Sequence, residues 1–516
     1  MAYIPAKYSN SIYKDHDLII VISNSLSSLV VPDLANALNI KAGIDPRVGK
    51  QASLVAIPNT SLRCLHVPLP DLLDDYQDVR AFFALGKQLG AHLDDLISIK
   101  PLVVLEIDDL QTTVASKYNH ALANIYFGIC QHQWQPLEAR EALGESSIER
   151  VAQISLYGMS NDEVQFINAT EQGKRIARDL CGTEPERMAP LGFAEYCEHA
   201  FQESVVECKV ESNIDNIKRD YPLLFAVARA SIEVPRHNPA VIHLSYKGDG
   251  PIEHVYYLAG KGITYDTGGA DLKVNGHMAG MSRDKGGAAA VAGLMYALGV
   301  LRPKGIKVIA QIGAVRNSIG AEAYVPDEII TSHAGVRVRV GNTDAEGRMV
   351  LADLLSHLKD QALEDEPNKS KLYSVATLTG HALVALGPYT ALVENAQAIN
   401  KGEGEHIAKC GEQWGDPCER SLLRKEDFEF IKPRTKADDV LSSNNAPSVS
   451  TVRGHQFPAA FLSIASGIQR YDTRCETPLA YTHIDIAGSG VEQMDWQHGK
   501  PTAAPVVALL AAFTYQ

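Results

Sequence analysis

The chain has 516 residues, 45% of them hydrophobic and 21% charged, which is enough for two or three globular domains, each with its own core. Its 62 acidic residues outnumber its 48 lysines and arginines, and no dense basic run could neutralise phosphates, so we expect neither nucleic acid nor an anionic membrane as a partner. The cysteines form no C-x-x-C pair, which argues against a disulfide scaffold and favours a reducing, cytoplasmic environment.

The N-terminal part of the chain alternates strand-like and helical segments. Its first residues, MAYIPAKYSNSIYKDHDLIIVISN, lack a basic region ahead of a long apolar stretch, so we expect no secretory signal. The runs DLIIVIS, ASLVAIP, PLVVLEI and RVAQISLYG are typical of strands, and ALGKQLGAHLDDL is typical of a helix. This pattern predicts a smaller N-terminal α/β domain over residues 1–160, without a recognisable catalytic motif.

A helical pattern over residues 161–185 separates this domain from the rest of the chain. The pattern ends at Gly182 and Pro185, two residue types that commonly follow a helix, and it predicts a linking helix. Residues 186–516 are therefore predicted to form a second, larger domain.

Strand-like runs and helical patterns alternate through this C-terminal domain. The strand-like runs are AVIHLSY, HVYYLAG, KVIAQIGAV and SVATLTG, and helices are predicted over 286–301 and 348–365, so we expect a mostly parallel central sheet flanked by helices. The polar stretch 400–456 is expected to form loops over one end of the sheet, where open α/β sheets bind ligands. The apolar run AAPVVALLAAF near the C-terminus is shorter than the roughly 18 residues that a membrane span needs.

The stretch AGKGITYDTGGADLKVNGHMAGMSRDKGG, residues 259–287, places charged groups after the strand HVYYLAG. Its glycines let the backbone approach other groups closely, and we expect the charged groups to lie on this loop: Lys261, Asp266, Lys273 and Asp284. Taken alone, Asp284 could be an ordinary N-cap of the helix that follows it.

The stretch GNTDAEGRMVLADLL, residues 341–355, holds a second set of charged side chains. Asp344 and Glu346 lie two positions apart, just ahead of a predicted helix. Arg348 follows at the same spacing, and Gly347 is expected to let the chain turn so that these groups face one cavity. Taken alone, the two carboxylates could complement the positive end of the helix.

The two stretches are expected to meet at one edge of the sheet, which changes how their charges are interpreted. Four carboxylates packed closely repel one another unless a cation lies between them. Carboxylates without neighbouring Cys or His suit divalent metal, and bridging carboxylates suit a pair of ions about 3.5–4 Å apart. The sequence contains no H-E-x-x-H, P-loop or G-x-S-x-G motif. These observations favour a two-metal hydrolase.

The motifs NTDAEGRMVLAD, GKGITYDTGG and RDKGGAA resemble those of the leucyl aminopeptidase family, peptidase family M17, whose members are cytosolic two-metal exopeptidases. The resemblance extends from about residue 160 to the C-terminus, through ARDL, VATLTG, YTHIDIAG and GKPT. It implies that five residues bind two zinc or manganese ions per chain: Lys261, Asp266, Asp284, Asp344 and Glu346. Within this set, Asp266 and Glu346 are implied to bridge the ions.

The same resemblance implies roles for further residues. Lys273 corresponds to the lysine that holds the substrate carbonyl oxygen, and Arg348 to the arginine that anchors a bicarbonate ion as general base. Met281, Thr377 and Gly380 correspond to positions of the pocket for the first side chain. The implied activity is the release of apolar, Leu- or Met-like residues from peptides with a free N-terminus by metal-activated water, in a cytoplasmic homohexamer.

Residues 277–285 and 316–328 depart from the common pattern of the family and resemble a divergent animal branch of it. Lys285 stands where methionine is usual, and Arg316 stands where glutamate is usual. Two alternatives therefore stay open. One is a two-metal dipeptidase or amidase of different specificity, and the other is a catalytically inactive member with a structural or assembly role.

Overall fold

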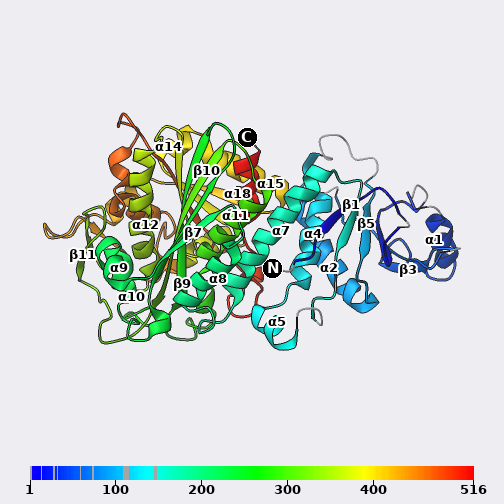
Figure 1. Ribbon diagram of the computed structural model, residues 1–516, viewed down its shortest axis with the longest axis horizontal. Coiled ribbons are helices and arrows are strands. Elements are labelled where there is room, and N and C mark those ends of the chain that lie inside the picture. The colour runs from blue at the N-terminus through cyan, green and yellow to red at the C-terminus, as the bar shows by residue number, and fades with distance from the viewer. Residues whose placement is uncertain are drawn as a thin grey trace. The chain divides into compact units, whose positions relative to one another are not determined.

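The computed structural model describes residues 3–12, 14–26, 30–31, 33–58, 60–72, 75–107, 116–144 and 148–515 (Figure 1). Contacts divide the chain into two compact units, one of residues 1–171 with 412–415 and one of residues 172–411 with 416–516. The division falls within helix α7 (Asn161–Gly182). Each unit contains a large, mostly parallel sheet with helices, so the predicted α/β class is confirmed.

The N-terminal unit contains a sheet in the order β1-β6-β5-β2-β4-β3, in which β3 is antiparallel to β4 and the other described pairs are parallel. The strand-like runs noted in this part of the sequence are confirmed, whereas the patterns did not indicate β1 and β4. The bounds are β1 (Ala6–Ser9), β2 (Leu18–Ile22), β3 (Ser53–Ala56), β4 (Arg63–Val67), β5 (Pro101–Leu105), β6 (Ile154–Tyr157), η1 (Ser116–Tyr118), α1 (Leu34–Ala42), α2 (Arg80–Leu96), α4 (Ala121–Gln133) and α5 (Leu137–Leu143).

The C-terminal unit contains a sheet in the order β15-β14-β17-β13-β9-β10-β8-β7. Its central strands β17, β13, β9 and β10 are mutually parallel, so their carboxyl ends meet at one edge of the sheet. The bounds are β7 (Glu207–Glu211), β8 (Ala240–Lys247), β9 (His254–Asp266), β10 (Ile306–Asn317), β13 (Ser370–Ala376), β14 (Thr390–Glu394), β15 (Cys418–Leu422) and β17 (Ala480–Asp485).

Helices α11 (Gly286–Leu301) and α12 (Glu346–Glu364) lie on opposite sides of this sheet (Figure 1). Side chains alternate along β9, so Tyr257 and Ile263 join the apolar core that includes α12. Gly260 instead faces α11, where a Cβ atom would lie 2.9 Å from the Cα atom of Ala288. Lys261 shares the α12 face of β9 and thus points to the side on which α12 begins.

The stretch 400–456 is more ordered than its polar composition indicates, so the expectation that it forms loops is wrong for residues 403–430, whereas most of residues 431–456 lie outside helices and strands. It contains the helices and strands α15 (Glu403–Trp414), α16 (Lys425–Phe430), β15 and β16 (Val440–Leu441). Ile407 and Trp414 are buried at helical spacing in α15. Polar residues around these two hide the apolar stripe in the sequence.

The remaining elements of the C-terminal unit surround the sheet. Among the described helices of the chain, none combines the length and the apolar character that crossing a bilayer requires.

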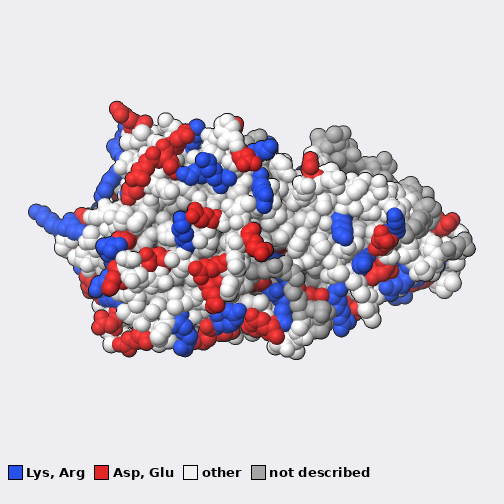
Figure 2. Space-filling model, viewed as in Figure 1, with Lys and Arg blue, Asp and Glu red and all other residues white. Residues whose placement is uncertain are grey.

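On the face of the C-terminal unit shown in Figure 2, acidic and basic side chains are intermixed. The remaining bounds are α8 (Pro190–Phe201), α9 (Ile214–Asp220), α10 (Pro222–Ala228), α13 (Gly380–Leu386), α14 (Ala396–Asn400), α17 (Phe457–Ala465), α18 (Val506–Thr514), β11 (Ile329–Thr331), β12 (Arg337–Arg339), η2 (Pro235–His237), η3 (Met281–Arg283), η4 (Ser448–Ser450), η5 (Ile468–Tyr471) and η6 (Glu492–Met494).

Candidate metal centre

Strand β9 extends beyond the run HVYYLAG because it pairs with β10 as far as Asp266 and Asn317. Lys261 and Asp266 therefore lie in a strand, and the expectation that both lie on a loop is wrong. The Asp266 carboxylate accepts hydrogen bonds from the Gly268 N–H at 2.9 Å and from the Asn317 side-chain amide at 2.8 Å. These bonds fix the carboxylate at the carboxyl edge of the sheet.

The glycine-rich loop lies against the loop that precedes α12. Gly268 has a φ of 87°, and a Cβ atom there would lie 2.5 Å from the Asp271 carbonyl oxygen and 3.2 Å from Asp344 Oδ1. Asp271 and Thr343 join the two loops, because the Thr343 N–H donates to the Asp271 carboxylate at 2.7 Å and the Asp271 N–H donates to the Thr343 hydroxyl at 2.8 Å. The two charged stretches are thus brought together.

Asp284 lies between η3 and α11, but it does not cap the helix. The N-cap residue of α11 is Lys285, which makes no side-chain capping bond. Asp284 Oδ1 instead accepts a hydrogen bond from the Thr377 hydroxyl at 2.8 Å and lies 2.7 Å from Lys261 Nζ. The alternative that Asp284 is an ordinary N-cap is therefore wrong.

Asp266, Asp284 and Glu346 form a buried carboxylate cluster. Each is at most 4% exposed, and one oxygen of each lies within 4.8 Å of the others. Lys261 Nζ lies 2.9 Å from Glu346 Oε1. A Cβ atom on Gly347 would lie 2.4 Å from Lys261 Cε, so this glycine makes room for the lysine within the first turn of α12 and does not turn the chain.

Asp344 and Lys273 extend this cluster toward its more exposed side. Lys273 Nζ lies 2.9 Å from Asp266 Oδ2 and 2.5 Å from Asp344 Oδ1. The Asp344 side chain is 35% exposed, against 3% for Asp266, so the two ends of the cluster differ in access to water. Direct contacts therefore join six of the charged residues singled out in the sequence into two neighbouring groups, whose carboxylates lie within 4.8 Å of one another through Asp266: Lys261 with Asp284 and Glu346, and Lys273 with Asp266 and Asp344.

Arg348 lies in the first turn of α12 and is 3% exposed. Its NH1 donates to the Ser442 carbonyl oxygen at 2.9 Å, and its guanidinium carbon lies 4.9 Å from the centre of the Phe457 ring. Burial lowers the pKa of Arg348 to about 10, against the effect of Glu346 and other nearby acids. Its Nε is buried and has no hydrogen-bond partner among the described residues, which leaves one donor for a small anion.

The electrostatics of the cluster fit a bound cation. Burial raises the pKa of Asp284 well above its ordinary value; neighbouring carboxylates add to the rise, whereas Lys261 opposes it. Burial and the Asp266 carboxylate raise the pKa of Asp344 to about 7, against the effect of the nearby ammonium. Asp284 Oδ2 is buried without a hydrogen-bond partner in the described part of the chain. Hard oxygen donors with an unused lone pair suit a divalent metal.

The three predicted pocket residues lie in separate elements. Met281 begins η3, and Thr377 follows β13, where its hydroxyl donates to Asp284 and its carbonyl oxygen accepts from Lys261 at 2.9 Å. Gly380 begins α13 and lies against η4, since a Cβ atom there would lie 2.6 Å from Val449 Cγ1. Thr377 thus contacts metal-ligand candidates directly, a contact that its position in the sequence does not indicate.

Two hydrogen-bonded histidines, buried His455 and half-buried His381, join the segment that follows η4 to α13. His455 is 3% exposed; its Nδ1 lies 2.8 Å from Nδ1 of His381, and its Nε2 lies 2.8 Å from the Ser421 hydroxyl. Burial lowers the pKa of His455 to about 4, and His381 and Arg453 lower it further, whereas Asp427 opposes them. The folded chain therefore holds this imidazole neutral.

This histidine should make the fold sensitive to acid. Its pKa in an unfolded chain is about 6.5, so the unfolded state binds more protons below neutral pH, and the free energy of unfolding falls as the pH drops from 7 toward 4. Between pH 7 and pH 5, we expect His455→Gln to lose about 1–2 kcal/mol less of that free energy than the parent protein. Urea unfolding at the two pH values measures the difference, and equal losses would contradict the assignment.

Several residues of the centre have no recognised motif in the sequence. Asn317 is fully buried and donates to Asp266 and to the Thr343 carbonyl oxygen at 3.1 Å. The Tyr324 hydroxyl donates to the same carbonyl at 2.8 Å. The only signal for Asn317 is its position as a polar residue directly after the run KVIAQIGAV and Arg316, at the edge where Asp266 was expected.

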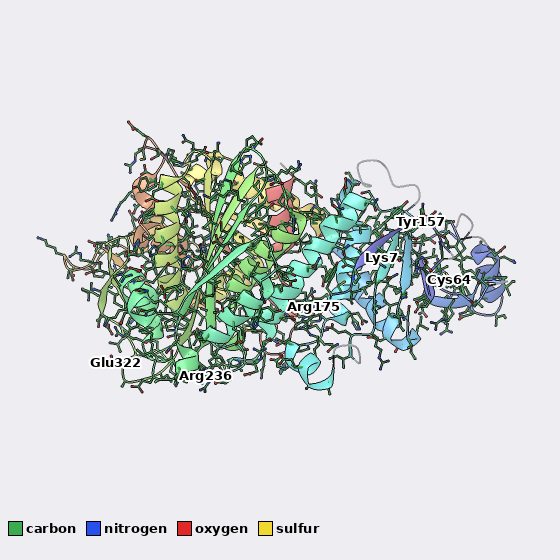
Figure 3. All side chains as sticks on the ribbon, viewed as in Figure 1. Lys7, Cys64, Tyr157, Arg175, Arg236 and Glu322 are labelled. Carbon is green, nitrogen blue, oxygen red and sulfur yellow. The ribbon has the colours of Figure 1, made fainter. Side chains whose placement is uncertain are left out.

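Arg316, one of the departures from the family pattern, belongs to a surface ion-pair network. Its NH1 lies 2.9 Å from Glu186 Oε1, and its guanidinium carbon lies 5.3 Å from the centre of the Tyr265 ring. Glu186 also binds Arg236, which lies near the lower edge of the unit in Figure 3. Arg316 thus lies beside the strand that carries Asp266, with its charge engaged by Glu186.

Comparison with known proteins assigns the chain to a family. The model of the catalytic domain of the cytosol aminopeptidase family matches residues 175–510. The Caenorhabditis elegans protein W07G4.4, whose name assigns it to the aminopeptidases, is similar to this chain at 35% identity over 492 residues, which covers 94% of this chain and 91% of that protein.

Two bacterial proteins named Probable cytosol aminopeptidase are similar over shorter spans. The protein of Aquifex aeolicus is 33% identical over 319 residues, 61% of this chain and 58% of its own length. The protein of Bacillus subtilis is 32% identical over 398 residues, 75% of this chain and 72% of its own length. With the family model matched across the unit that holds the carboxylate cluster, the chain belongs to the cytosol aminopeptidase family, peptidase family M17, and is a metal-dependent peptide hydrolase.

Proposed function

We propose that this chain is a two-metal aminopeptidase that releases Leu- or Met-like residues from peptides with a free N-terminus. The observation that carries the proposal is the buried cluster of Asp266, Asp284 and Glu346 around Lys261, at the carboxyl edge of the sheet. Carboxylates buried together destabilise a fold unless cations neutralise them. A retained cluster of this kind supports an active enzyme over an inactive member of the family.

We propose that the cluster binds two zinc or manganese ions. Lys261, Asp266, Asp284 and Glu346 would hold the first ion, and Asp266, Asp344 and Glu346 would hold the second. When bound, such ions supply Lewis acidity toward the peptide carbonyl and lower the pKa of water. Carboxylate oxygens and a single amine accept either metal, so availability would decide which one is bound.

Lys273 would act on the substrate, and Arg348 would act on the transfer of a proton from water. The Lys273 ammonium lies at the more exposed side of the cluster, and it would donate to the substrate carbonyl oxygen and stabilise the charge that develops there. Arg348, whose Nε lacks a partner among the described residues, would hold a bicarbonate ion that accepts the proton from water. The buried guanidinium is fixed by Ser442 and Phe457 before the anion binds.

The first side chain of the substrate would bind between η3 and α13. Met281 offers a flexible apolar surface, and Gly380 lets the exposed side chain of Val449 lie directly against the start of α13. An apolar pocket with these walls suits unbranched or γ-branched aliphatic side chains. This is the basis for expecting Leu- or Met-like substrates.

The first test is metal dependence of turnover. The purified full chain is stripped with a chelator, reloaded with Mn²⁺ or Zn²⁺, and assayed with leucine p-nitroanilide and with Leu- and Met-initiated peptides. Hydrolysis is expected only after reloading. If metal-loaded protein cleaves dipeptides or other amides but cleaves no peptide of more than two residues, the alternative specificity is favoured. Metal-loaded protein without any turnover would contradict the proposal.

We further propose a cytoplasmic homohexamer, on the resemblance to the family alone. Analytical ultracentrifugation of the full chain at micromolar concentration should give a single species of six copies. A stable monomer under these conditions would contradict the assembly and leave the metal centre unaffected.

A further inference from the structure

A fully buried lysine directly follows Asp284. The Lys285 side chain is 0% exposed and is among the largest side chains that the fold buries completely. An ammonium group in such surroundings destabilises a fold unless hydrogen bonds replace its lost hydration. The groups that accept from Lys285 Nζ therefore indicate what this residue does.

Lys285 Nζ donates to two backbone carbonyl groups from different elements. One belongs to Ser282, in the short helix η3 that ends immediately before Asp284. The other belongs to Thr183, which follows α7, at a distance of 2.9 Å. A single cation thus connects the η3 turn to the end of α7.

Two other contacts hold the same turn from outside. Arg283 NH1 donates to the Trp496 carbonyl oxygen, and Cys181 Sγ lies 3.7 Å from the Arg283 carbonyl oxygen. These contacts hold Arg283, the last residue of η3, whereas the Lys285 contact holds Ser282, its middle residue, and closes the turn. An apolar side chain of the same size would fill the space but would leave the Ser282 and Thr183 carbonyl groups without this donor.

We propose that Lys285 is a positioning residue that orients Asp284 toward the metal ions, and this proposal rests on the function proposed above. One oxygen of Asp284 is engaged by Lys261 and Thr377, whereas Oδ2 is buried without a hydrogen-bond partner among the described residues. The direction of Oδ2 follows from the η3 turn, which Lys285 closes. Loss of a group that orients a metal ligand typically weakens metal binding by about 10- to 100-fold.

The charge of Lys285 acts in the opposite direction to its hydrogen bonds. An ammonium group near a cation site repels the cation, so removal of the charge alone would tighten metal binding. Removal of the hydrogen bonds releases the turn and weakens metal binding. The sign of the change in affinity therefore separates a positioning role from a purely electrostatic one.

The test uses Lys285→Met in the full chain, because methionine keeps the unbranched shape and most of the volume of the side chain without the donor or the charge. Calorimetric titration of metal-stripped protein with Mn²⁺ is expected to give binding about 10- to 100-fold weaker than in the parent protein. The visible spectrum of the Co²⁺-loaded variant should also change, because the ligand geometry around the ion differs. Lys285→Gln keeps an N–H donor on a side chain one atom shorter than lysine. Its affinity for Mn²⁺ should lie between those of Lys285→Met and the parent protein.

Lys359→Met is the matched control. Lys359 is also a buried lysine that donates to a backbone carbonyl, that of Ser466 at 3.3 Å, and it lies about 20 Å beyond Glu346 along α12. This variant tests the general effect of removing a buried ammonium group. Its Mn²⁺ affinity and Co²⁺ spectrum are expected to equal those of the parent protein.

Each outcome decides between the proposals. Unchanged or tighter Mn²⁺ binding by a folded Lys285→Met variant overturns the positioning role and leaves the proposed function intact. Equal weakening in the Lys359→Met control also overturns it, because the effect would then be general. If Lys285→Met does not fold, the Lys285→Gln titration decides by the same criteria. A parent protein that binds no divalent metal overturns the proposed function and this proposal together.

Discussion

Glu346→Gln is expected to abolish both metal binding and turnover. Glu346 is 2% exposed, it begins α12, and its Oε1 lies 2.9 Å from Lys261 Nζ within the carboxylate cluster. The substitution keeps the shape but removes a negative charge and replaces one of the two carboxylate oxygens with an NH2 group, which cannot bind a cation. Because loss of a group behind a ligand already weakens metal binding about 10- to 100-fold, loss of the ligand itself should exceed about 100-fold.

Metal content after dialysis and leucine p-nitroanilide hydrolysis measure this result. Glu364→Gln is the control, since Glu364 is exposed at the other end of the same helix. The control should keep both the metals and the activity. Full turnover by Glu346→Gln would remove this cluster as the catalytic centre.

Lys273→Met is expected to keep the metals and to lose catalysis. The Lys273 ammonium contacts Asp266 and Asp344, and removing it leaves these carboxylates free of a competing cation, so metal binding should be unchanged or tighter. Loss of one preorganised donor to a developing oxyanion typically lowers kcat by about 100- to 1,000-fold. The change should fall mainly on kcat and not on KM, because the charge develops in the transition state.

Steady-state kinetics and calorimetric titration with Mn²⁺ separate these two effects. Lys304→Met, at an exposed lysine between α11 and β10, should leave both unchanged. Loss of metal from Lys273→Met to the extent expected for Glu346→Gln would contradict the division of roles between these two residues. A proportional rise in KM without a change in kcat would assign Lys273 to substrate binding alone.

Much of the fold follows from local patterns in the sequence. The runs AVIHLSY and KVIAQIGAV lie in observed strands, SVATLTG begins in β13 and continues beyond it, and the helix predicted over 286–301 has those same bounds in the structure. Apolar runs of strand length and small-residue helices bury themselves in a sheet with little dependence on distant residues. The stretch 400–456 did not follow this rule, because the buried Ile407 and Trp414 are surrounded by polar residues.

The sequence by itself determined which chemical groups are present and in which two stretches they lie. The carboxylates of both stretches, the lysines of the first and the arginine of the second are specified by residue type, and their spacing is local. It did not determine that Lys261 and Asp266 lie within β9, because that extension depends on pairing with β10. It also left open whether Asp284 caps α11.

Only the tertiary structure decided those questions. Asp284 turns to Thr377 and Lys261, Asn317 reaches Asp266 from the neighbouring strand, and Lys285 donates to a carbonyl more than one hundred residues earlier in the chain. Each of these contacts joins residues far apart in sequence, so no local pattern encodes it. Parallel strands bring their carboxyl ends to one edge, and burial there makes every charge depend on partners that only the folded chain supplies.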